Sequence, residues 1–263
     1  MSMSTNSEEL KASTLGTAHL DKFDSLRSVF FRHVAQDDTA AVDTTVRQHL
    51  DLAARRTAAS DLVAYLPADR EARTGPALLV ITDDRPLLVD ALTAGVESAG
   101  ATIAHLLHPV ISVVRGPDGA LIDLSVGASP PAETIVESWI RIEFATPPSD
   151  SIREYMMESV WHLLLTLRQI NADSPVMRAQ QRDLADTLEK ASAAGESSWS
   201  EDELVDAAAL LRWLGDGNFT LLGYYYRGDD TREDRCPSAL GTYRGDAGDL
   251  RTQRRRWQAG PCY

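Results

Sequence analysis

Cysteine and aromatic residues are scarce in this sequence. Its 263 residues include only two cysteines, Cys236 and Cys262, both near the C-terminal end. They provide neither a disulfide framework nor the four ligands of a structural zinc site, so we expect a chain that folds without either, in a reducing cytoplasm. Aromatic residues make up 6% of the sequence, against 43% hydrophobic residues. The core must therefore consist of Leu, Val, Ile and Ala, which is typical of a layered protein of helices and strands.

The sequence also lacks an excess of basic charge and a long hydrophobic run. Its net charge is -13, from 39 acidic and 26 basic residues, which disfavours binding to nucleic acid or to an anionic membrane. No stretch approaches the roughly 20 apolar residues of a membrane-spanning helix. The polar residues Met1–Lys11 contain no basic cluster followed by an apolar segment, so they do not resemble a signal peptide. We therefore expect a soluble protein.

Two amphipathic helices are predicted before residue 66. Apolar residues recur at helical spacing from His19 to about Val34 and again from Thr39 to Thr57. The stretch Leu66–Pro76 is rich in Pro, Asp, Glu and Arg, which is the composition of a linker. We interpret residues 1–66 as a polar start and a helical prefix, and we expect a domain to begin near residue 76.

A strand, a tight loop and a helix open this domain. The apolar run Ala77–Ile81, flanked by Pro and Asp, predicts a buried strand. From Pro86 onward apolar residues recur every three or four positions, and Gly100 is placed to end that helix. A second strand is expected over Ala101–Leu107. It should break near His108–Pro109 and then resume, because proline cannot donate a hydrogen bond within a sheet.

An antiparallel hairpin and a further strand follow. The glycine-rich turn at residues 115–119 predicts that Ala120–Leu124 pairs with the preceding strand. In Val136–Phe144 the residues alternate, which predicts one face in the core and one face nearer water. The residues predicted to face water are Glu137, Trp139, Arg141 and Glu143.

A long helix and a second helical segment complete the pattern. Ser151–Glu154 matches a capping box, and the helix that it opens carries an apolar stripe that includes Tyr155. Asp173–Pro175 should interrupt or bend that helix. Another capping box, Ser200–Glu203, predicts a helix that stops at Gly215, followed by a strand over residues 219–226.

This order of elements predicts an α+β fold with a ferredoxin-like antiparallel sheet that helices cover on one face. A strict ferredoxin-like repeat places its second helix before the last strand, so the order is either a variant or contains a misplaced element. We assign residues 76–192 to this domain and residues 200–228 to the start of a following segment. Residues 229–263, where Arg251 and Arg254–Arg256 follow the last acidic residue, are predicted to be a disordered or divergent tail.

Two stretches resemble a known family. Asp83–Leu92, between the first strand and the first helix of the domain, is similar to the Asp-Arg-Pro-Gly-Leu loop of ACT domains. Leu210–Tyr224 closely resembles a segment of the large actinobacterial-type NAD-specific glutamate dehydrogenases, located after their N-terminal ACT-like region. Residues 16–228 are consistent with that region, and the dehydrogenase module of the family would lie far downstream of them.

The resemblance implies a regulatory or oligomerisation fold within a parent enzyme that converts L-glutamate, NAD and water to 2-oxoglutarate, ammonia and NADH. It implies NAD as the cofactor of the parent, and no catalytic, cofactor-binding or metal-binding residue in this chain. The implied partners are the remainder of the parent enzyme, further copies of the chain and an amino-acid effector. The alternative is a stand-alone ACT-type regulator that senses amino acids.

The resemblance also implies a ligand site. In ACT regulators the loop after the first strand can receive an amino-acid carboxylate at a helix N-terminus. Asp84, Arg85 and Leu87 occupy this loop, so Arg85 would bind the carboxylate and Asp84 the ammonium group. Leu87 stands where the family usually has glycine, and its side chain would crowd the ligand. The competing interpretation is a solvated loop, in which Asp83 and Asp84 point apart and perform no acid–base chemistry.

Other motifs carry less functional meaning. Gly215–Thr220 begins like a dinucleotide-binding fingerprint, but it lacks the last glycine and follows a helix instead of a strand. His105 with His108, and Glu158 with His162, are two pairs of potential metal ligands without a third ligand nearby. We therefore expect a helix end at the glycines, His105 on a strand, and His162 beside the apolar stripe of its helix.

Overall fold

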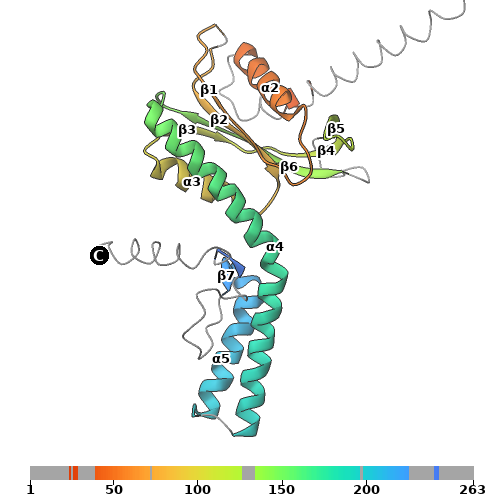
Figure 1. The fold of residues 1–263 in the computed structure, drawn as a ribbon, viewed down its shortest axis with the longest axis vertical. Helices are drawn as coiled ribbons and strands as arrows, with labels where there is room; N and C mark the ends of the chain where they lie inside the picture. Colours follow the sequence, from red (N-terminus) through yellow and green to blue (C-terminus); the bar gives the residue numbers. More distant parts are fainter. Residues whose placement is uncertain are drawn as a thin grey trace, which may run out of the picture. The chain divides into compact units, whose positions relative to one another are not determined.

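The computed structural model describes residues 24, 26–28, 39–71, 73–125, 134–195, 198–224 and 240–242. The chain divides into two compact units, Met1–Leu163 and Leu164–Tyr263, and helix α4 (Asp150–Ala194) contributes to both (Figure 1). The helix predicted from His19 to about Val34 lies largely outside the described residues, of which Asp24 and Leu26–Ser28 are helical. Among the helices of the described ranges, none combines the length and the apolar character needed to cross a membrane.

Unit 1 is built on a six-stranded sheet in which every neighbouring pair is antiparallel (Figure 1). The strands in their order across the sheet are β1 (Leu62–Leu66), β2 (Ala77–Asp83), β6 (Ile135–Phe144), β4 (Val110–Arg115) and β5 (Leu121–Ser125). Strand β3 (Ile103–Leu107) pairs with the second half of β6 and β4 with the first half, so the two share one side of this long strand. The predicted break at His108–Pro109 is confirmed, since it separates β3 from β4.

The strand order confirms the predicted ferredoxin-like fold and explains its unusual sequence of elements. Strand β2, helix α3 (Leu88–Ser98) and strand β3 form a split β-α-β unit, with β6 between the two strands. In a strict repeat, a strand after the second helix would pair with β2 at the sheet edge. Here β1, which precedes β2 in the sequence, occupies that edge. The sequence had suggested only helices and a linker in this range, so β1 was missed.

Helices cover both faces of the sheet, which corrects the prediction of one covered face. Helix α2 (Thr39–Ala53) lies over one face, whereas α3 and the first part of α4 lie over the other (Figure 1). The apolar stripe of α2 packs with Ile81 and Trp139 in one buried cluster. The side of β6 predicted to face water is therefore buried: Glu137, Trp139 and Arg141 have an exposed fraction of 0%.

Helix α4 differs in detail from its prediction. It begins at Asp150, and the Oγ of Ser149 accepts a hydrogen bond from the backbone N–H of Ile152 (3.4 Å). The predicted capping box at Ser151–Glu154 is therefore wrong, because these residues already lie inside the helix. Tyr155 is 53% exposed and does not belong to the core. The helix is continuous through Pro175, so the expected interruption does not occur.

Unit 2 contains the second part of α4 and helix α5 (Glu201–Trp213), whose capping box at Ser200 and Glu203 is confirmed. A short π-helical turn over Leu214–Asn218 ends α5. Of the strand predicted for residues 219–226, only β7 (Gly223–Tyr224) is found in the part that the structure describes, and residues 225 and 226 lie outside it. β7 pairs with β8 (Leu240–Gly241), two residues of the segment predicted to be a disordered or divergent tail.

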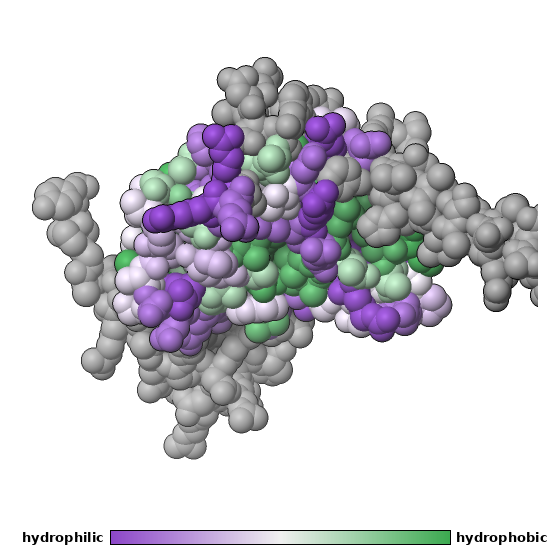
Figure 2. Space-filling view, turned by 90° about the horizontal axis from the view of Figure 1, so that it is seen from above, coloured by the Kyte–Doolittle hydropathy of each residue, from purple (hydrophilic) through white to green (hydrophobic). Residues whose placement is uncertain are grey.

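The surface of unit 1 is not uniformly polar. Seen from above, hydrophobic side chains gather in an area between hydrophilic ones (Figure 2). Strands β4, β5 and β6 contribute large exposed hydrophobic residues in this unit. These are Val110, Ile122, Ile135 and Val136. The helices therefore leave part of the sheet uncovered by the described residues.

Candidate functional site

The loop between β2 and α3 contains one residue in a left-handed backbone conformation. Leu87 precedes the helix with φ 65° and ψ 4°, in the left-handed region that favours glycine. The position thus adopts the conformation expected where the family usually has glycine, although it carries a side chain. No side chain caps the first turn of α3. The first amide groups of α3 lie at the positive end of the helix dipole, where an anion is favoured.

Asp84 is exposed in this loop and is held in place by β6. Its backbone N–H donates to the carbonyl of Val136 (3.0 Å), and its carboxylate accepts a hydrogen bond from the Oγ of Ser138 (2.7 Å). The same Oγ lies 2.9 Å from Nε2 of His108. Because the serine proton points to Asp84, His108 must donate through Nε2 to the serine oxygen. Burial lowers the pKa of His108, although Asp84 opposes this effect, so the imidazole is neutral near pH 7.

This hydrogen-bonded row is not a nucleophilic triad, although it joins His108, Ser138 and Asp84. In such a triad the histidine accepts the proton of the serine, whereas here the serine donates to a carboxylate and the histidine donates to the serine. Ser138 is also fully buried, so a substrate cannot reach its oxygen. These hydrogen bonds instead fix the position of the Asp84 carboxylate, which lies at the surface and can bind a cationic group.

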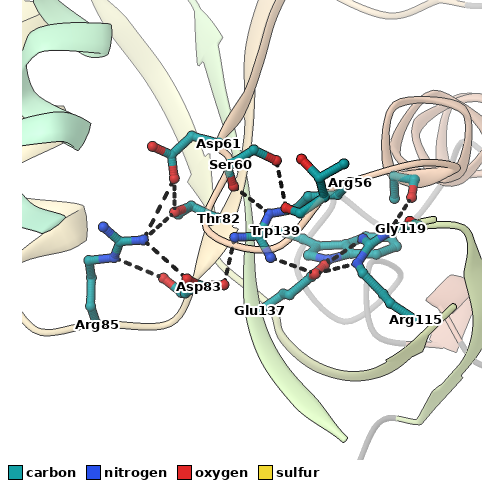
Figure 3. A network of polar contacts seen from close by, with 12 residues as sticks. Arg56, Ser60, Asp61, Thr82, Asp83, Arg85, Arg115, Gly119, Glu137 and Trp139 are labelled. Atoms are coloured by element: carbon teal, nitrogen blue, oxygen red, sulfur yellow. Dashed lines mark hydrogen bonds and ion pairs between the residues drawn. The ribbon is translucent and has the colours of Figure 1, made fainter. Parts of the chain in front are cut away.

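Arg85 directs its guanidinium group toward Asp61, Thr82 and Asp83 (Figure 3). Its side chain is 3% exposed, and Nη2 donates to the Oγ1 of Thr82 (2.9 Å). The same nitrogen lies 3.6 Å from Asp61 and 3.7 Å from Asp83. In this arrangement Arg85 packs on the buried side of the loop, whereas the Asp84 carboxylate lies on its exposed side. Asp83, the last residue of β2, and Asp84 have separate partners, as expected for adjacent residues that point apart.

A second polar cluster, which the sequence did not predict, surrounds the buried carboxylate of Glu137 (Figure 3). Oε1 accepts hydrogen bonds from Nη1 of Arg56 (2.8 Å) and Nε of Arg115 (2.6 Å). Oε2 accepts hydrogen bonds from Nη2 of Arg115 (2.9 Å) and Nε1 of Trp139 (2.9 Å). Burial alone would raise the pKa of Glu137, but these donors outweigh it and lower the pKa. Glu137 therefore remains ionised in the interior.

Arg56 connects this carboxylate to the rest of unit 1. Its Nη2 donates to Asp83 (2.6 Å), and its Nε donates to the carbonyl of Ser60 (2.7 Å). The backbone N–H of Arg56 donates to the carbonyl of Gly119 in the β4–β5 hairpin (2.9 Å). A side chain at Gly119 would come within 2.5 Å of the Arg56 backbone, so only glycine fits this contact. The cluster therefore joins the end of α2, β2, β6 and the hairpin, and its role is structural.

The remaining residues singled out from the sequence are not brought together. His105 and His162 are exposed. The described residues contain no group of three His, Cys, Asp or Glu side chains that could hold a metal ion. At the glycine-rich turn of unit 2, Gly217 has φ 92° and Nδ2 of Asn218 donates to the carbonyl of Trp213 (2.8 Å). This closes the end of α5, as expected for a helix end.

His49 is a buried histidine that the sequence analysis did not consider. Its ring stacks on Trp139, with the ring centroids 6.4 Å apart and an angle of 5° between the planes. Its Nδ1 donates to the carbonyl of Thr45 (2.8 Å). Complete burial lowers the pKa of His49 to about 3, with the charge of Arg141 adding to the effect and the bond to Thr45 opposing it. The imidazole is therefore neutral at physiological pH.

Comparisons with known proteins agree with this fold. Residues 25–160 match the family described as glutamate dehydrogenase, ACT1 domain. The NAD-specific glutamate dehydrogenase of Mycobacterium tuberculosis is 31% identical over 176 residues, which cover 67% of this chain and 11% of that protein. The enzyme of the same name from Halomonas elongata is 28% identical over 175 residues, or 64% of this chain and 11% of the relative. The chain thus spans about a tenth of the length of these relatives, and it belongs to the glutamate dehydrogenase ACT1 domain family.

Proposed function

We propose that this chain is the N-terminal regulatory and oligomerisation part of an NAD-specific glutamate dehydrogenase that acts in the cytoplasm in amino-acid catabolism. The family match over residues 25–160 and the similarity to a small part of much longer dehydrogenases carry the proposal. The parent would convert L-glutamate, NAD and water to 2-oxoglutarate, ammonia and NADH. NAD would bind to the parent outside this chain.

The regulatory role would be exerted through an amino acid bound at the β2–α3 loop. The Asp84 carboxylate is exposed, and Ser138 fixes its position, so it would take the ammonium group. The uncapped amides that follow Leu87 would take the carboxylate. Arg85, which is buried under the loop, would contribute by holding the loop and by adding positive charge below it. The Leu87 side chain would crowd the ligand, so binding would be weak or would need a second subunit to complete the pocket.

The oligomerisation role supposes that the parent is a homo-oligomer in which this chain meets other copies. The exposed hydrophobic residues of β4, β5 and β6 support this role, because the described helices do not cover them. The β2–α3 loop supports it as well, because a second copy would enclose the proposed ligand site.

The proposal is tested on the parent enzyme, with and without the segment that corresponds to this chain. The 263-residue chain by itself should form no NADH from glutamate and NAD. The intact parent should be active and should respond to an amino-acid effector, and the truncated parent should keep NADH formation while losing that response. Glutamate-dependent NADH formation by the purified chain above a heat-killed control, or an unchanged effector response after truncation, would refute the proposal. A reading frame without a dehydrogenase module would instead assign a stand-alone sensor.

A further inference from the structure

Ser138 of β6 joins two segments that reach it from opposite sides of the strand. On the side of β2, the loop residue Asp84 donates its backbone N–H to β6 (3.0 Å) and accepts a hydrogen bond from the Oγ of Ser138 (2.7 Å). On the side of β4, the backbone N–H of Trp139 donates to the carbonyl of Pro109 (3.0 Å), which fixes the break that contains His108. The Nε2 of His108 lies 2.9 Å from the same Oγ. A carboxylate and an imidazole are therefore one serine oxygen apart.

Among the described residues, Asp84 carries the charge that acts on His108. Burial lowers the pKa of the imidazole, and the negative charge of Asp84 opposes this effect. Asp90, in the first turn of α3, is exposed to solvent. The other charged groups of β2, the loop and β6 have partners of their own. These are Asp83, Arg85, Glu137 and Arg141. The proton affinity of His108 therefore depends on the charge at Asp84.

A ligand at Asp84 and a proton on His108 must affect each other. An ammonium group beside the carboxylate offsets its negative charge, so it lowers the pKa of His108 further. Thermodynamic linkage is reciprocal, so a proton on His108 weakens the binding of the ammonium group by the same factor. The neutral imidazole has no such effect, because its Nε2–H donates to Ser138 and leaves the serine proton to Asp84. Protonation thus changes the charge near the carboxylate without needing a change in its hydrogen bonds.

We propose that His108 is a positioning residue of the amino-acid site at the β2–α3 loop and links the occupancy of that site to pH. The neutral imidazole, acting through Ser138, holds the Asp84 carboxylate in place for the ammonium group of the ligand. The protonated imidazole competes with that group for the same negative charge. The inference rests on the amino-acid site proposed above and adds its regulation: acidification releases the ligand, and neutral pH favours its binding.

The first measurement needs no ligand. The pKa of His108 is determined from the pH dependence of its imidazole signals in NMR spectra of the wild-type chain and of Asp84→Asn. The substitution removes the charge that raises the pKa and keeps the shape of the side chain, so the pKa of His108 should fall. Asp123→Asn, at an exposed position of β5, is the matched control and should leave this pKa unchanged.

The second measurement is the affinity for glycine, the amino acid that the side chain of Leu87 crowds least. Isothermal titration calorimetry is carried out with the wild-type chain at pH 7.5 and at pH 5. Binding should be about threefold weaker at pH 5, which is the scale of effect expected from one added unit charge near the surface. In NMR spectra, glycine should lower the pKa of His108 in the wild type.

Two substitutions separate the proton from the hydrogen bond. His108→Gln keeps an N–H donor for Ser138 but cannot take up a proton, so its affinity for glycine should match the wild type at pH 7.5 and stay the same at pH 5. His108→Leu has no donor for Ser138 and should bind glycine more weakly at both pH values. His105→Gln, at an exposed histidine of β3, is the matched control and should keep the pH dependence of the wild type.

The outcomes separate this inference from the broader proposal. If Asp84→Asn leaves the pKa of His108 unchanged, or if glycine binds equally well at both pH values, the inference is refuted although the amino-acid site stands. The same holds if His108→Gln retains the pH dependence of the wild type. If glycine does not bind to the wild-type chain, the inference is also refuted, and titration of other amino acids at pH 7.5 decides whether the regulatory proposal survives. Circular dichroism at both pH values shows whether each variant is folded.

Discussion

The two faces of the sheet in unit 1 are equally buried but chemically different. Along β6, Glu137, Trp139 and Arg141 point under α2, whereas Ile140 and Ile142 point toward α3 and α4, and all five have an exposed fraction of 0%. On the α2 face the buried carboxylate of Glu137 accepts hydrogen bonds from Arg56 and Arg115, and a neutral histidine stacks on Trp139. The opposite face is mainly aliphatic.

This difference shows that the two buried faces of one strand are stabilised by different interactions. Aliphatic packing depends on shape and is largely independent of pH. The polar face depends on each partner being present and in its correct ionisation state, because an unpaired charge in the interior is costly. Mutations and acid should therefore affect the α2 face in ways that the other face does not share.

The largest effect is expected from Glu137→Gln. The substitution keeps the shape of the side chain but removes the negative charge, and it leaves Arg56 and Arg115 buried beside a neutral amide. We expect a loss of about 3–5 kcal/mol in the free energy of unfolding, the usual cost of breaking a buried ion pair. Urea denaturation followed by tryptophan fluorescence measures it, with the exposed Glu97→Gln as the control. A loss below about 1 kcal/mol would show that the cluster is not structural.

A comparable but different loss is expected on the aliphatic face from Ile140→Ala. Removing these buried methyl and methylene groups costs transfer free energy and leaves a cavity, about 2–4 kcal/mol together. Because no ionisable group is involved, the loss should be the same at pH 7 and pH 5. Urea denaturation at both pH values checks this, and a loss that changes strongly with pH would break the contrast between the faces.

An intermediate effect is expected from acid, through His49. The pKa is about 3 in the folded chain and near the ordinary 6.5 in the unfolded chain, so the unfolded state binds more protons between these values. The stability contribution is thus complete above pH 6.5 and is lost as the pH falls toward 3. By pH 5 the loss amounts to about 2 kcal/mol.

His49→Phe isolates this contribution. The substitution keeps a ring on Trp139 but cannot take up a proton, so the free energy of unfolding should change much less between pH 7 and pH 5 than in the wild type. Glu137 does not interfere, because its lowered pKa affects stability only below the ordinary value of 4.5. An equal pH dependence in the variant and the wild type would mean that other groups cause the acid sensitivity.

The smallest effect is expected from Ala59→Gly, in the turn after α2. Ala59 is exposed and has φ 56°, which costs a non-glycine residue about 1–2 kcal/mol. Glycine relieves this strain but gains about 0.4–1 kcal/mol of unfolded-state entropy, so a net stabilisation of about 0.5 kcal/mol is expected. A thermal melt with a slightly raised midpoint would agree with the turn geometry, and a clear destabilisation would not.

Local patterns predicted most of the fold. Helix α5 and strands β2, β4 and β6 were predicted because capping residues, apolar runs and alternation lie within a few neighbours of each residue. Strand β1 was missed because a five-residue apolar segment is defined as a strand only by its pairing with β2. The covering of a second face was missed because it depends on where α2 packs, which helical periodicity does not specify.

The candidate site was only partly predictable for the same reason. The loop between strand and helix was predicted from the sequence, and Asp84 is exposed as a loop residue should be. The inward direction of Arg85 depends on Asp61 and Thr82, which the fold brings to it. The Glu137 cluster depends on Arg56, 81 positions away in the sequence. One signal of this cluster was available in the sequence. A tryptophan lies between a glutamate and an arginine on one face of β6, and a tryptophan rarely marks a water-facing side.

The central claim, that this chain binds an amino acid at the β2–α3 loop, is tested most directly by isothermal titration calorimetry. A panel of amino acids is titrated into the wild-type chain, into Asp84→Asn, and into Asp123→Asn, an exposed control on β5. Removing the charge of Asp84 should weaken the binding of an amino acid at least tenfold, because its ammonium group loses an ionic partner. The control should bind like the wild type. Unchanged affinity in Asp84→Asn, or the absence of binding to both the chain and the intact parent, would contradict the account.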